Sequence, residues 1–230
     1  MDFSDWEPAY EAVLEDFGYD RGDDEAVRDV LDSLVEEADG SPRSVSDLDC
    51  SGTVAVCGAA PSLSAEIEGA RNADTVVAAS AAADVLQAVG VEVDCLVTDL
   101  DSSPVTARQL SESGTTVAVH AHGDNEAAVR KQVPELDVGS VLPTTQAEPV
   151  GHVENPGGFT DGDRAAFLAD AAGADRLTFP GWDLDDPTVG EIKARKLEWA
   201  ERMLYWLEER RDERFEVLNG RRIGIELPWL

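Results

Sequence analysis

Positive charge is scarce in this sequence. Three lysines stand among 18 basic residues, against 48 aspartates and glutamates, and the formal net charge is −30 at pH 7. Nucleic acid and anionic membranes are bound through cationic surfaces, which such a chain does not offer. We therefore expect no nucleic acid and no membrane among its partners.

Long apolar runs and paired cysteines are also missing. No apolar run approaches the roughly 20 residues of a membrane span, and no basic-then-apolar leader opens the chain. We therefore expect a soluble, untargeted, cytoplasmic protein. The cysteines Cys50, Cys57 and Cys95 are odd in number and show no C-x-x-C spacing, which predicts buried reduced thiols and no disulfide framework.

The acidic residues are spread over the whole chain. This distribution with few lysines resembles that of proteins from salt-accumulating extreme halophiles, where a Debye length of about 3 Å at 1 M salt screens self-repulsion. The alternative is an ordinary acidic protein. A fold equally stable in low salt and in molar KCl would favour the alternative.

Short β-branched runs alternate with alanine-rich helical patterns from Cys50 onward. The predicted strands are Thr53–Cys57, Thr75–Ala79, Asp94–Thr98, Thr115–Val119, Val138–Leu142 and Arg176–Phe179. The predicted helices between them are Leu63–Arg71, Ala82–Val89, Pro104–Ser113, Glu126–Gln132 and Asp163–Ala172. Strands that are apolar throughout and separated by helices predict a Rossmann-like α/β fold, a mostly parallel sheet with helices on both faces.

Both ends of the chain carry other patterns. Helical spacing near Trp6–Phe17 and Asp23–Ala38, the second capped by Asp23 or Asp24, predicts a helical extension over 1–49. We expect a catalytic core over 50–186. Residues 187–230 should then form a long helix to about Arg211 and a β-hairpin, since Asn219-Gly220 suits a type I′ turn.

Two aspartates follow the third predicted strand. Asp99 and Asp101 would project to one side just beyond its carboxyl edge, where two oxygens can hold one hard cation. Mg²⁺ accepts one or two carboxylates and takes its other ligands from water and phosphates. The pair therefore indicates a Mg²⁺ site, with turn formation as the alternative.

The next strand ends in the segment 120–125, His-Ala-His-Gly-Asp-Asn. His120 and His122 should share one side, and Asp124 or Asn125 can cap the following helix, whose N-terminus favours phosphate. Zinc is disfavoured, because no cysteine is near and His152 has no recognisable spacing. We interpret the histidines as phosphate contacts or outer-sphere groups of a Mg²⁺ site; the alternative is packing against the sheet edge.

Two glycine-containing loops add phosphate-binding candidates. The turn Gly58-Ala-Ala-Pro61-Ser62 follows the first strand, and its small residues let backbone amides approach a phosphate or ribose; an ordinary turn explains it equally well. Neither G-x-G-x-x-G nor a P-loop lysine is present.

The second such loop is the segment 157–164. Gly158 permits close backbone approach, Thr160 or Asp161 can cap the following helix, and Arg164 offers a planar fork for phosphate. The alternative is a capped loop in which Arg164 pairs with a neighbouring carboxylate. Asp183, after another apolar run, is a weaker candidate of the same kind.

Together these motifs resemble the archaeal 6-hydroxymethyl-7,8-dihydropterin pyrophosphokinase family, a relative of the thiamine pyrophosphokinase superfamily. The resemblance rests on Gly58 with Pro61-Ser62-Leu63, on Val97–Asp101, on the segment 120–125 and on Gly158–Arg164. It spans the core from about Thr53 to Asp183. Ala60 departs from the glycine expected there, which leaves the nucleotide role of that turn less defined.

The resemblance implies Mg²⁺-dependent transfer of the diphosphate of ATP to the hydroxymethyl group of a reduced pterin, giving AMP and a pterin diphosphate for tetrahydrofolate or methanopterin synthesis. The resemblance implies that Asp99 and Asp101 bind the metal. A homodimer is expected from the resemblance alone. The candidate catalytic residues are Asp101, His122, Asp124 and Arg164; the candidate ligand-binding residues are Gly58, Pro61, Ser62, His120, Asn125, Gly158, Thr160 and Asp161.

Three other functions fit the same residues. A thiamine pyrophosphokinase would use the same chemistry on another alcohol, and a sugar-nucleotide transferase would use D-x-D to hold a diphosphate leaving group. A nucleotide-binding regulatory module would bind ATP without turnover. Formation of AMP with each acceptor alcohol separates these alternatives.

Overall fold

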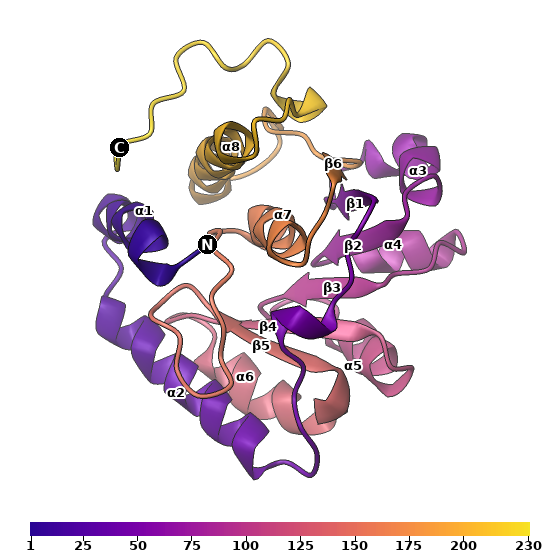
Figure 1. Cartoon of the computed structure of the whole chain (residues 1–230), viewed down its shortest axis with the longest axis vertical. Helices are drawn as coiled ribbons and strands as arrows, with labels where there is room; N and C mark the ends of the chain where they lie inside the picture. The colour runs from indigo at the N-terminus through magenta and orange to yellow at the C-terminus, as the bar shows by residue number, and fades with distance from the viewer.

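One six-stranded parallel sheet forms the centre of the molecule. The computed structural model describes all 230 residues, and its sheet has the order β5-β4-β3-β2-β1-β6, which confirms the predicted α/β class (Figure 1). The strands are β1 (Thr53–Cys57), β2 (Thr75–Ala79), β3 (Cys95–Thr98), β4 (Thr116–Ala121), β5 (Val141–Thr145) and β6 (Arg176–Thr178). All five strand pairs are parallel.

Helices cover both faces of this sheet (Figure 1). One face carries α2 (Arg21–Glu37), α3 (Leu63–Arg71), α4 (Ala82–Ala88), α5 (Pro104–Glu112) and α6 (Glu126–Gln132), which share one buried apolar cluster with the strands. The other face carries α1 (Phe3–Phe17), α7 (Asp161–Ala171) and α8 (Glu191–Arg211), which share a second cluster. The molecule is therefore a three-layer sandwich.

The chain reverses its direction across the sheet after β5. From β1 to β5 each strand lies beside its predecessor, and α7 then crosses the opposite face so that β6 pairs with β1. In open parallel sheets, loops that leave in opposite directions open a crevice at the carboxyl ends of the strands. Because β3 and β4 are parallel, the end of β3 that precedes the aspartates and the end of β4 that carries the histidines lie at the same edge of the sheet.

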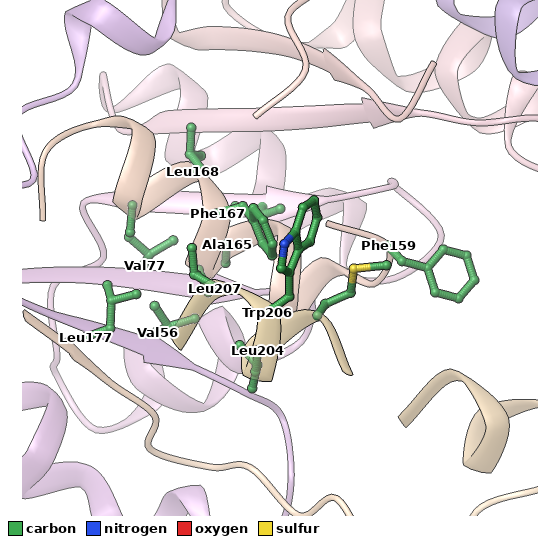
Figure 2. Close-up of a cluster of buried hydrophobic side chains, with 14 of the residues drawn as sticks. Val56, Val77, Phe159, Ala165, Phe167, Leu168, Leu177, Leu204, Trp206 and Leu207 are labelled. Atoms are coloured by element: carbon green, nitrogen blue, oxygen red, sulfur yellow. The ribbon is translucent and has the colours of Figure 1, made fainter. Parts of the chain in front are cut away.

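The apolar layer between the sheet and α8 is built around α7. Figure 2 shows side chains of α7, including Phe167 and Leu168, among those of the strands and of α8. The ring centroid of Trp206 in α8 lies 5.8 Å from that of Phe167 and 6.2 Å from that of Trp6 in α1. Burying each such side chain contributes about 1.5–3 kcal/mol. The packing fixes α7 and α8 relative to the sheet.

The three cysteines are free and buried, as predicted. Burial raises the pKa of the Cys50 thiol to about 11 and that of Cys57 to about 12, and it raises the pKa of Cys95 further. The thiols are therefore protonated packing groups. Separately, none of the helices is long and apolar enough to cross a membrane.

Two local predictions were wrong by a few residues. The cap of α2 is Asp20, whose side chain accepts from Gly22 N at 2.7 Å, because Asp23 and Asp24 already lie inside the helix. The strand predicted over Val138–Leu142 is β5, Val141–Thr145, because residues 138–140 form a 3-10 turn. Pro143 is tolerated there since β5 is an edge strand.

The predicted C-terminal hairpin is also wrong. Residues 216–218 form a 3-10 turn, and no strand follows Asn219-Gly220. A type I′ turn needs positive φ at both central residues, but Asn219 has φ −63° and only Gly220 is positive, at 81°. Instead Arg222 donates hydrogen bonds to the buried Glu208 carboxylate of α8, at 2.7 Å to each oxygen, and holds the tail against that helix.

Candidate active site

A cavity of about 700 Å³ opens at the carboxyl edge of the sheet. Its walls come from the loops after β1, β2, β3 and β4, from the start of α7 and from the loop after β6. The α1–α2 connection and one face of α8 complete it. The volume lies within the range of about 300–1,000 Å³ typical of small-molecule sites.

Asp99 and Asp101 enter the cavity from a tight turn after β3. The strand ends at Thr98, and Leu100 between the aspartates adopts φ +65°, a left-handed conformation unusual for leucine. Asp101 N donates to Asp99 Oδ1 at 3.1 Å. The two carboxylates are therefore brought together by a turn, where the sequence predicted strand alternation.

The two carboxylates have opposite pKa shifts. Burial raises the pKa of Asp99, but hydrogen bonds from His122 and from Asp101 outweigh it and hold that pKa well below its usual value. Burial and the neighbouring Asp99 raise the pKa of Asp101. Two acidic groups that repel each other in this way are a suitable pair for one cation.

Asn125 fixes the two strand ends relative to each other. Its amide nitrogen donates to Asp99 O at 2.8 Å and to His120 O at 2.7 Å, and its Oδ1 accepts from His122 N at 3.0 Å. The side chain is buried and does not line the cavity. Asn125 therefore positions Asp99 and His122.

The two histidines have different environments. His122 lines the cavity, with Nε2 3.5 Å from Asp99 Oδ2, and its Nδ1 accepts from Asp124 N at 3.4 Å. His120 is buried beneath the cavity, where Nδ1 contacts Thr144 Oγ1 at 3.1 Å and Nε2 has no partner. Burial, and then Arg164 and His122, hold the pKa of His120 well below its usual value, so its ring is neutral.

The start of α7 brings Asp161 and Arg164 to the cavity. Thr160 is the N-cap, and the Asp163 carboxylate accepts from Thr160 N at 2.9 Å and from Phe159 N at 2.5 Å. Arg164 Nη1 lies 3.2 Å from Asp161 Oδ1. Burial and the nearby Asp99 raise the pKa of Asp161 to about 7. Arg164 thus pairs with a neighbouring carboxylate, as the alternative interpretation of this loop expected, and it also lines the cavity; its contact with phosphate stays a prediction.

Glycine is required where this loop meets α7. Gly158 has φ +92°, and a Cβ there would lie 2.6 Å from the backbone of Arg164. Arg164 Nη2 also contacts Gln146 Oε1 at 3.1 Å, while its buried Nε has no partner. The guanidinium is thus held by the fold, and only part of its five-donor capacity is used within the chain.

The loop after β1 packs against the loop after β6. Gly58 N donates to Pro180 O at 2.9 Å and Ala60 N to Gly181 O at 3.0 Å, so these amides are already satisfied. A Cβ on Gly58 would lie 2.5 Å from Gly181 O. The Ser62 hydroxyl is buried without a partner and does not line the cavity.

The structure gathers most of the predicted site residues around one cavity. Those that line it are Gly58, Pro61, Asp99, Asp101, His122, Asp124, Thr160, Asp161, Arg164 and Asp183. Ser62, His120, Asn125 and Gly158 lie behind this lining.

Sequence reasoning missed two other parts of the wall. Tyr19 and Asp20 come from the α1–α2 connection and Asp23 from the first turn of α2, and no motif indicates that these segments lie at the sheet edge. Lys193 and Lys196 come from α8. The sequence did contain a signal for these two residues, because they are two of only three lysines in the chain.

Comparison with known proteins identifies the family. Residues 31–188, more than half of the chain, match the family model described as 6-hydroxymethylpterin diphosphokinase MptE-like. The chain belongs to this family. The matched range contains every site residue predicted from the sequence, whereas α1 and α8 lie outside it.

Relatives named as pyrophosphokinases match nearly the whole chain. A 6-hydroxymethyl-7,8-dihydropterin pyrophosphokinase of Methanothermobacter thermautotrophicus is 38% identical over 94% of this chain and 99% of its own length. Proteins of the same name from Methanocaldococcus jannaschii and Pyrococcus furiosus are 31% and 34% identical over 91% and 90% of this chain and 97% and 94% of their own lengths. The protein is therefore an enzyme of the diphosphotransferase class, as the family resemblance of its motifs implied.

Proposed function

We propose that this protein transfers the diphosphate of ATP to the hydroxymethyl group of 6-hydroxymethyl-7,8-dihydropterin, giving AMP and the pterin diphosphate. The observation that carries the proposal is the convergence of Asp99, Asp101, Asp161 and Arg164 on one cavity in a chain that matches pyrophosphokinases over nearly its full length. The product would serve tetrahydrofolate or methanopterin synthesis.

The donor set fits Mg²⁺. Asp99 and Asp101 offer carboxylate oxygens at the cavity. Burial and repulsion from Asp99 raise the pKa of Asp101, and a bound dication would offset that repulsion. No group of three acidic, histidine or cysteine side chains forms a protein cage for a metal. Two carboxylates completed by water and substrate phosphates are the usual Mg²⁺ arrangement. Bound there, Mg²⁺ would neutralise charge on the transferred diphosphate.

The chain's own residues position the reaction. In the proposed step the pterin hydroxyl oxygen attacks the β-phosphorus of ATP, the bond from that phosphorus to the α–β bridging oxygen breaks, and AMP leaves with that oxygen. Diphosphate transfer depends on alignment and charge neutralisation more than on a strong base. Arg164, held by Asp161 and Gln146, would stabilise the added negative charge.

Asp124 is the better acceptor for the hydroxyl proton. His122 accepts a hydrogen bond at Nδ1, so in the tautomer that satisfies both contacts its proton is on Nε2, toward Asp99. The Asp124 carboxylate is exposed at the cavity and accepts no hydrogen bond within the chain. We assign it to orient the hydroxyl and to receive its proton, with His122 orienting Asp99.

The test incubates the enzyme with ATP, Mg²⁺ and one acceptor alcohol at a time and measures the AMP that forms. We expect AMP and a pterin diphosphate with the reduced pterin and no turnover with thiamine. Asp101→Asn should lower kcat by about 10³-fold, the upper end for loss of one group that stabilises transition-state charge. Circular dichroism should show the variant folded.

Asp212→Asn is the matched control. Asp212 is exposed beyond the end of α8, outside the cavity, and its left-handed backbone suits asparagine. The same change of charge there should leave the rate unchanged. Absence of AMP with the reduced pterin would refute the proposed function, and wild-type rates in Asp101→Asn would refute the metal assignment.

A further inference from the structure

One face of α8 lines the cavity with two lysines. The contributing residues are Lys193, Lys196, Leu197 and Ala200. Their spacing of i, i+3, i+4 and i+7 places them on a single stripe of the helix. The catalytic edge of the sheet therefore faces a helical wall that lies beyond the range matched by the family model.

Contacts on the opposite side of α8 hold the helix in the orientation that turns the two lysines toward the cavity. Arg195 Nη2 donates to Asp16 O at 2.7 Å and pairs with Asp16 Oδ1 at 3.1 Å, and Trp199 Nε1 donates to Asp16 Oδ2 at 2.7 Å. Trp199 is buried against α1 and the start of α7. Because Arg195 and Trp199 anchor α8 to the end of α1, rotation of the lysine stripe away from the cavity is opposed.

The two ammonium groups are free of carboxylates. Most arginines of this acidic chain form ion pairs, for example with Glu7, Asp170 or Glu208. Neither Lys193 nor Lys196 forms an ion pair or a hydrogen bond within the chain. Lys196 Nζ lies 5.8 Å from the centroid of the Phe159 ring, next to the loop that begins α7. In a chain with net charge −30, two unpaired lysines in one cavity leave cationic sites open to an anion.

We propose that Lys193 and Lys196 bind the β- and γ-phosphates of the nucleotide, the group that the enzyme transfers. This assignment rests on the proposed function and names the part of the site that receives the donor's charge. The chain has no P-loop lysine, and the many carboxylates of the cavity repel a polyphosphate. A lysine ammonium is a compact point charge on a flexible stem, suited to phosphate oxygens that move during transfer.

The test compares binding of Mg·ATP and of AMP by titration calorimetry at fixed salt. The probe variant is Lys193→Met with Lys196→Met, which keeps the unbranched stems and removes both charges. Loss of one charge-assisted hydrogen bond weakens binding about 10-fold, so the pair should weaken ATP binding about 100-fold. AMP lacks the β- and γ-phosphates, and its affinity should be unchanged.

Lys131→Met is the matched control. Lys131 is the third lysine, exposed on α6 and outside the cavity, so its replacement removes one positive charge away from the cavity, and ATP affinity should remain that of the wild type. Lys193→Arg with Lys196→Arg should restore most of the ATP affinity, since positive charge is retained. Circular dichroism confirms that each variant is folded.

The outcomes separate this inference from the proposed function. An ATP affinity unchanged by the double methionine variant, or an equal loss of ATP and AMP affinity, overturns the lysine assignment. A wild-type enzyme that forms no AMP with the reduced pterin overturns the proposed function, and the selective loss of ATP affinity in the variant would still uphold the lysines as a polyphosphate site.

Discussion

Replacement of Asn125 by alanine tests how the site is assembled. This side chain connects the end of β3 to the end of β4 through three hydrogen bonds, to Asp99 O at 2.8 Å, to His120 O at 2.7 Å and from His122 N at 3.0 Å. All three partners are backbone groups. Replacement by alanine removes all three bonds. Because Asn125 does not line the cavity, the change removes no contact with substrate.

The expected loss of stability follows from these bonds. At about 1 kcal/mol for each hydrogen bond, Asn125→Ala should lower the free energy of unfolding by about 3 kcal/mol. Since Asp99 and His122 lose their common anchor, a shift of ~1 Å in either should lower kcat by about 10²-fold. Urea denaturation in molar KCl and the AMP assay measure the two effects.

Asn155→Ala is the matched control for this experiment. Asn155 donates to Gln146 O at 2.9 Å and to Ala147 O at 2.8 Å and accepts from Gly157 N at 2.9 Å, so the same number of bonds is lost. We expect a similar loss of stability with a smaller loss of activity. Equal losses of activity in the two variants, or an unchanged stability of Asn125→Ala, would refute the positioning role.

Three further predictions concern the whole chain. Glu208→Ala leaves Arg222 without its buried partner and should lower the free energy of unfolding by about 3 kcal/mol in urea titrations; an unchanged midpoint would contradict this. Because the pKa of Asp161 is raised from 3.8 to about 7, its protonated form favours the fold, and stability of the metal-free protein should fall as pH rises through that interval. Asp161→Asn should remove this pH dependence, and an identical profile in the variant would argue against it. Finally, unfolding should require more denaturant in molar KCl than at low salt, since the net charge is −30; equal midpoints would favour an ordinary acidic protein.

Elements with strong local signals were predictable from the sequence. β1, β2, α3 and α6 begin and end where their patterns predict, because apolar strands and helical spacing report burial directly. The C-terminal tail was not predictable from its turn residues. Asn219-Gly220 suits a hairpin locally, but packing of Phe215 and Leu218 against α8 and the bonds of Arg222 to Glu208 determine another path.

The chemistry of the site was more predictable than its enclosure. Motifs at strand ends identified Asp99 and Asp101, because parallel strands bring their carboxyl ends to one edge, and the glycine loop before α7 identified Arg164. They gave no indication of the turn that joins the aspartates, which depends on the left-handed Leu100. Nor could they place Tyr19 or Lys193, since the packing of α1 and α8 over the crevice is a tertiary property.

The fate of each phosphate of ATP tests the central claim most directly. ATP labelled separately at the α-, β- or γ-phosphorus would be incubated with the reduced pterin and Mg²⁺, and the pterin product isolated. We expect both β and γ labels in the pterin product and the α label in AMP alone. A product that carries only the γ label, or one that carries the α label, would contradict diphosphate transfer at this site.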